Sequence, residues 1–142
     1  MTTTWTSALP AVCVATPVAG ACVLLAAGHW LPRWAVDAVA TAVTVLGAVF
    51  AALLLAHTAH GRVVEWAGGW QPRPHLTVGI VLAADRTNAG ITVLIFALAT
   101  VALLFGWRYF DSVHAHYHAL VLLFTAGMAG FALTGDLFDM FV

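Results

Sequence analysis

Two carboxylates near the end of the chain have a spacing that could serve proton or ion chemistry. Asp136 and Asp139 are three residues apart, so on a helix they share a face, and repulsion between like charges would favour protonation of one of them. Carboxylates close to membrane depth are rare and usually functional. A second interpretation stays open, because Thr134-Gly135-Asp136 reads as a helix stop followed by a start, which would make both acids solvated loop and cap residues.

Three alternating histidines and one acid at a predicted helix start are further candidates. His114, His116 and His118 could collect a metal ion on a strand, or through His114 and His118 alone on a helix, but no cysteine or second histidine pair in this loop supports a metal site. We therefore expect histidines at the membrane–water interface, with surface proton collection as the alternative. Asp85 and Arg86 open an apolar segment, and capping is the expected role of Asp85 because a carboxylate suits the positive end of a helix dipole.

The candidates for an ion or proton pathway are therefore Asp136, Asp139, Asp85 and His118. The chain shows no nucleophile beside a base, no phosphate-binding glycine loop and no zinc-protease helix. Cys13 and Cys22 match no zinc or redox spacing and are interpreted as small apolar side chains. We predict no catalytic residues, no metal site and no cofactor in this chain.

Composition indicates an integral membrane protein. Of 142 residues, 63% are hydrophobic and 8% are charged, and the mean hydropathy is +0.98, whereas soluble domains are about 45–50% apolar and about 25% charged. Five arginines, no lysine and a net charge of −1 provide no basic patch for a phosphate backbone, which excludes nucleic acid as a partner. We predict a multi-pass protein of the plasma membrane that contacts the lipid bilayer.

Four apolar segments are long enough to cross a hydrocarbon core of about 30 Å, which takes about 20 helical residues. They cover about 7–28, 35–56, 85–107 and 117–134, and a fifth helix is expected to start near 137. The predicted fold is thus all-α and membrane-integral. In the fourth segment, small residues at three- and four-residue steps predict a face that packs closely against neighbouring helices. These small residues are Ala126, Gly127, Ala129, Gly130 and Gly135.

The connection between the second and third segments predicts a short β-hairpin. Two β-branched runs, at 62–66 and 76–82, flank a Gly-Gly and a Pro-x-Pro sequence. A hairpin over about 62–82 has to lie outside the hydrocarbon, because an open sheet edge in lipid leaves backbone groups unpaired. Arginines flank the two sides of the predicted spans almost equally, so their distribution alone does not orient the chain.

Three stretches of the chain together resemble one protein family. They are Gly68-Gly69-Trp70-Gln71-Pro72, the run 78–85, and the run 117–142, in which Thr134-Gly135-Asp136-Leu137-Phe138 is the most specific element. The chain resembles the Mrp-type monovalent cation/proton antiporter subunits, the D-type members most closely, over about residues 60–142. Relatives of that family are the antiporter-like proton-pumping subunits of NADH:quinone oxidoreductase and of membrane-bound hydrogenases.

The resemblance implies an outward amino terminus and a β-hairpin between the second and third helices. Members usually carry Asn where this chain has Asp139. Their ion movement depends on a Glu in the fifth helix and on lysines in later helices, whereas this chain has no lysine and its only Glu is Glu65. The resemblance therefore implies the amino-terminal portion of a transporter, a fragment or a split subunit, with working residues beyond Val142.

Three functions follow as alternatives. The first is a part of a multi-subunit antiporter that exchanges Na⁺ or K⁺ for H⁺ together with other membrane subunits. The second is a proton-pumping membrane subunit of an NADH:quinone oxidoreductase or hydrogenase complex, whose redox centres reside on other chains. The third is a small membrane assembly protein. Whether the chain is part of an enzyme depends on which of these holds.

Overall fold

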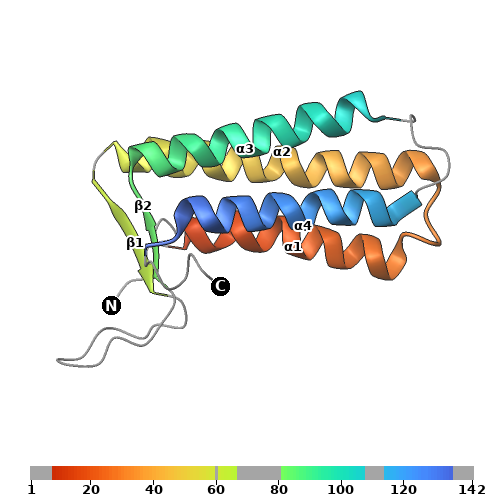
Figure 1. The fold of residues 1–142 in the computed structure, drawn as a ribbon, viewed down its shortest axis with the longest axis horizontal. Coiled ribbons are helices and arrows are strands. Elements are labelled where there is room, and N and C mark those ends of the chain that lie inside the picture. The colour runs from red at the N-terminus through yellow and green to blue at the C-terminus, as the bar shows by residue number, and fades with distance from the viewer. Residues whose placement is uncertain (1–7, 60, 67–80, 108–113, 136–142) are drawn as a thin grey trace.

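Four long helices and one small sheet make up the structure, a computed structural model that describes residues 8–59, 61–66, 81–107 and 114–135 (Figure 1). The helices are α1 (Leu9–Ala27), α2 (Arg33–Thr58), α3 (Arg86–Phe105) and α4 (His114–Leu133), and the strands are β1 (Val63–Trp66) and β2 (Val81–Ala84). Each helix is long and apolar enough to cross a membrane. The chain is a multi-pass membrane protein.

The helices form an up-and-down bundle in which successive helices run antiparallel (Figure 1). α1 packs against α2 and α4, α2 packs against α3, and α3 closes the bundle against α4. This order brings the start of α1, the end of α2, the start of α3 and the end of α4 to the side that carries the sheet, which we call the hairpin end. The connection 28–32, the end of α3 and the start of α4 lie at the other side, the opposite end.

The predicted fold class is confirmed, with four membrane-length helices and a two-stranded antiparallel sheet between the second and third of them. The helix bounds lie within about three residues of those predicted from hydropathy, and α4 begins earlier than expected, at His114. In the sheet, Val63 pairs with Ala84 and Trp66 with Val81, so the second strand ends two residues beyond the predicted position 82. The predicted start of a fifth helix near 137 lies outside the described residues.

Two contacts fix the sheet to the helix ends. The backbone N–H of Gly135 donates a 2.7 Å hydrogen bond to the carbonyl of Val81, and Thr134 forms an antiparallel bridge with Leu82. A methyl group on Gly135 would lie 3.0 Å from the Cβ atom of Ala83, so a glycine lets α4 end directly on β2. The Thr-Gly pair that ends α4 therefore has a packing role.

On the other strand, Glu65 completes the first turn of α1. No side chain from the Ala8 position caps this helix, and Glu65 Oε2 instead accepts a 3.0 Å hydrogen bond from the backbone N–H of Ala11. The first N–H groups of a helix lack intrahelical partners and carry partial positive charge, so an anionic acceptor stabilises them. The single Glu of the chain is thus a long-range helix cap.

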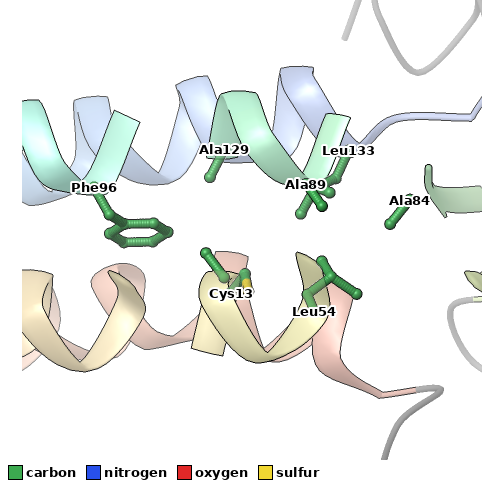
Figure 2. Close-up of a cluster of buried hydrophobic side chains, with 8 residues drawn as sticks. Cys13, Leu54, Ala84, Ala89, Phe96, Ala129 and Leu133 are labelled. Carbon is green, nitrogen blue, oxygen red and sulfur yellow. The ribbon is translucent and has the colours of Figure 1, made fainter. Parts of the chain in front are cut away.

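Small side chains bring the helices together at both ends of the interior. At the hairpin end, the buried side chains point toward one another between the helices (Figure 2), and they are Cys13, Ala51, Leu54, Ala84, Ala89, Phe96, Ala129 and Leu133. At the opposite end, a second cluster consists of Ala21, Leu24, Val36, Ala40, Leu103, Ala115, Ala119 and Leu122, which we call the opposite-end cluster. Gly47 permits a close approach, because a Cβ atom there would lie 2.2 Å from the ring of Phe96.

The small-residue face predicted on the fourth segment is partly present. Ala126 and Ala129 are buried, and a Cβ atom on Gly130 would make ordinary contact with Val14 at 3.8 Å. Gly127 is exposed, and a Cβ atom there would meet nothing within 4 Å. The packed face of α4 therefore follows the alanines rather than every small residue of the stripe.

Candidate functional site

A buried aspartate–histidine pair joins α2 to α4 within the bundle. The imidazole Nε2 of His118 lies 2.7 Å from Oδ1 of Asp37, and the two residues are 8% and 7% exposed. Isolated buried charges are strongly unfavourable, and here the two groups supply each other with a hydrogen bond that offsets part of the cost of burial. The pair is the chemically most distinctive group in the described part of the chain.

Local sequence explains how both side chains reach this position. Asp37 comes four residues after the first residue of α2, and His118 four residues after the first residue of α4, so each lies about one turn inside its helix at the opposite end. Alanines at 40, 115 and 119 are buried next to them and leave room for α2 and α4 to approach. The pair therefore sits in an otherwise apolar cluster.

A line of hydroxyl groups continues from Asp37 along the same face of α2. Thr41 and Thr44 follow at the four- and seven-residue steps that place side chains on one helix face. The hydroxyl of Thr100 on α3 donates to that of Thr44 at 3.0 Å. The hydroxyl of Thr41 is buried and has no hydrogen-bond partner among the described residues.

The side chains of the pair have the chemistry that proton binding requires. A carboxylate and an imidazole in contact can carry one proton between them or two, and each state keeps a hydrogen bond between Asp37 and His118. Within the described ranges, no three histidine, cysteine or acidic side chains gather as a metal site would require. Proton binding is thus the chemistry that these residues support.

The structure gives different outcomes for the residues singled out from sequence. Asp136 and Asp139 lie outside the described residues. Asp85 caps α3 as expected, since its side chain accepts a 2.8 Å hydrogen bond from the backbone N–H of Asn88. His118 is buried inside the bundle because α4 begins early, at His114, whereas His116 is exposed, and the location of these histidines at the membrane–water interface stays a prediction.

Asp37 is the residue that the sequence analysis missed. A signal was available, because Asp37 is the single acid inside the apolar run 35–56 and is followed on the same helical face by two threonines. Its partner could not be found in the same way, since His118 lies 118 − 37 = 81 positions further along the chain. Only the packing of α4 against α2 brings the two together.

Comparison with known proteins adds to this description of a multi-pass membrane protein with a buried aspartate–histidine pair. No model of a known protein family matches the chain. The chain is 39% identical over 82 residues to the D component of a probable K⁺/H⁺ antiporter of Rhizobium meliloti (strain 1021), which covers 58% of this chain and 14% of that protein. It is 35% identical over 109 residues to the D component of a Na⁺/H⁺ antiporter of Bacillus subtilis (strain 168), covering 72% of this chain and 20% of that protein. The chain thus spans no more than a fifth of the length of either relative.

Proposed function

We propose that the chain works as a subunit, or as a part of a subunit, of a monovalent cation/proton antiporter in the plasma membrane. The observation that carries the proposal is the similarity to two proteins named as antiporter subunits of the D type, which reaches 72% of this chain in one of them. One relative is named for K⁺ and the other for Na⁺, so the cation of this chain is one of these two ions. Because both relatives are named as single subunits of an antiporter, their names support further membrane subunits as partners.

The structure supports the proposal through its architecture and its one buried ionisable pair among the described residues. Four membrane-length helices place Asp37 and His118 inside protein rather than against lipid. Ionisable side chains in that position usually belong to ion or proton pathways. Asp85 at the hairpin end, together with Asp136 and Asp139, completes the set of proposed pathway residues, although the cap that Asp85 provides to α3 already explains that residue.

The orientation of the chain is part of the proposal. The hairpin end faces outward, as the resemblance to the antiporter family implies, and the opposite end with its connection 28–32 faces the cytoplasm. The structure places the sheet and the connection 28–32 at opposite ends of the bundle, which this orientation requires. The buried pair would then lie close to the cytoplasmic side.

Everted membrane vesicles test the function. The coding sequence of this chain is deleted from its host, and respiration-driven acidification of the vesicles is followed with a pH-sensitive dye before and after NaCl or KCl is added. Cation-dependent dequenching should disappear in the deletion strain and return with the chain supplied in trans, while a copy with an early stop codon should not restore it. Equal dequenching with and without the chain would contradict the proposal.

A second measurement addresses partners. The isolated chain in liposomes should exchange no cation for protons, because the lysines and the additional Glu on which the antiporter family depends are absent from it. Cation-dependent dequenching from the isolated chain would contradict the need for other subunits. Loss of NADH oxidation in the deletion strain, without any loss of cation-dependent dequenching, would favour membership of a redox complex instead.

A further inference from the structure

The buried pair lies close to one end of the bundle and far from the other. Asp37 is four residues from the start of α2, which corresponds to about 6 Å along the helix axis. From Asp37 to the end of α2 at Thr58 the same helix continues for about 30 Å. Phe96 against Gly47 fills the interior on that longer side.

We propose that Asp37 and His118 form a proton-binding site that exchanges protons with the water at the opposite end of the bundle. The inference deepens the proposed function, on which its role in transport rests, because it names where such a subunit would take up a proton. In the binding step, a hydronium ion gives its proton to the carboxylate or to the imidazole, an O–H or N–H bond forms, and water is released. The charge of the pair rises by one, and no other bond changes.

The contact geometry allows the pair to exist in two protonation states. At a separation of 2.7 Å, the Nε2–H group of His118 can donate to the carboxylate of Asp37 whether the imidazole is neutral or protonated. The buried hydroxyl of Thr41, one turn further along α2, lacks a partner among the described residues and can either donate or accept. Both protonation states therefore find hydrogen-bonding groups nearby.

Among the described side chains, three other ionisable groups lie close to this pair in sequence on its own helices. On α2, Arg33 lies one turn before Asp37. On α4, the ring of Tyr117 stands edge-on to that of His118 with centroids 5.3 Å apart, and His116 is exposed. Among the described side chains, a proton added to the pair is thus one way in which charge can change beside the opposite-end cluster.

The other packed elements contribute apolar groups to the same place. α1 adds Ala21 and Leu24 to the opposite-end cluster, and α3 adds Leu103. The ionisable side chains of these two helices are Cys13, Cys22 and Arg86, and none of them belongs to that cluster. His29, in the connection 28–32, is exposed.

Magic-angle-spinning NMR of the full chain in phosphatidylcholine vesicles tests the site. With ¹⁵N-labelled histidine and ¹³C-labelled aspartate, the His118 signals are identified by their through-space correlation with an aspartate carboxyl group and by their loss in His118→Gln. Spectra are recorded between about pH 5 and about pH 9, and we expect the imidazole nitrogens and the Asp37 carboxyl group to change together in this series. His118 signals that keep one protonation state at every pH in this range would overturn the proposal. The pair would then only stabilise the packing of α2 against α4.

Two variants test whether the protonation of His118 depends on Asp37 rather than on a general change in the protein. In Asp37→Asn the pH at which His118 changes should move, whereas in His57→Gln it should stay, because His57 is exposed on α2 and its Nδ1 bonds to the carbonyl of Leu53. An unmoved His118 transition in Asp37→Asn would also overturn the proposal. The wild-type titration decides the question even if one variant fails to fold.

Transport in everted vesicles distinguishes this inference from the proposed function. His118→Gln should abolish the cation-dependent dequenching, and His116→Gln, its exposed neighbour on α4, should retain it. A pair that titrates in a chain whose deletion leaves dequenching unchanged would support the proton site and contradict the antiporter role. Full dequenching in His118→Gln would contradict the role of the site in transport.

Discussion

The contact between Gly47 and Phe96 provides the sharpest test of how α2 and α3 pack. A Cβ atom on Gly47 would lie 2.2, 2.6 and 2.7 Å from three ring atoms of Phe96, whereas ordinary contact begins at 3.4 Å. The ring would have to move by 3.4 − 2.2 = 1.2 Å, and it is fully buried. Overpacking of this kind costs about 1–3 kcal/mol.

Gly47→Ala also brings a gain, since alanine is a better helix former than glycine by about 1 kcal/mol. Gly127→Ala is the matched control, because it has the same propensity gain and its new methyl group would meet nothing within 4 Å. The free energy of unfolding of Gly47→Ala should therefore fall below that of Gly127→Ala by about 1–3 kcal/mol. Unfolding in mixed micelles with increasing dodecyl sulfate, followed by circular dichroism, measures this difference.

A second substitution tests whether the ring of Phe96 causes the loss of stability in Gly47→Ala. Phe96→Leu removes the atoms that the new methyl group would meet, so Gly47→Ala should be tolerated better in that background, with a coupling of about 0.5–3 kcal/mol in the double-mutant cycle. Equal stability of Gly47→Ala and Gly127→Ala, or additive effects in the cycle, would refute the close packing of α2 on α3.

The caps and the topology give further predictions. Glu65→Ala should lower the free energy of unfolding by about 0.5–2 kcal/mol and speed hydrogen exchange at Ala11, while Glu65→Gln, which keeps an acceptor oxygen, should recover most of the loss. Asp85→Ala should cost a similar amount and Asp85→Ser much less, measured by the same unfolding assay, and equal costs would contradict the cap. In a cysteine-free background, Arg62→Cys should label from outside intact cells and Trp30→Cys only after permeabilisation. Labelling of both from one side would contradict the up-and-down order.

The sequence predicts features that depend on neighbouring residues better than features that depend on residues far apart in the chain. The four helices follow from apolar runs of membrane length, and the sheet from β-branched runs next to turn residues. The end of β2 did not follow, because Ala83 and Ala84 are poor strand formers that pair with Val64 and Val63 only in the context of the bundle. The His118 contact depends on helix packing, which local spacing does not contain.

The most specific part of the family resemblance and the most distinctive chemistry lie at different ends of the molecule. Thr134 and Gly135, which open the Thr-Gly-Asp-Leu-Phe run, end α4 on β2 at the hairpin end, where the Gly135 contact leaves little room for a side chain. Packing alone is enough to explain a threonine and a glycine at these two positions. Similarity in that run therefore supports a shared architecture more directly than a shared ion chemistry. Asp37 and His118, at the opposite end, are the described residues at which that chemistry has to be tested.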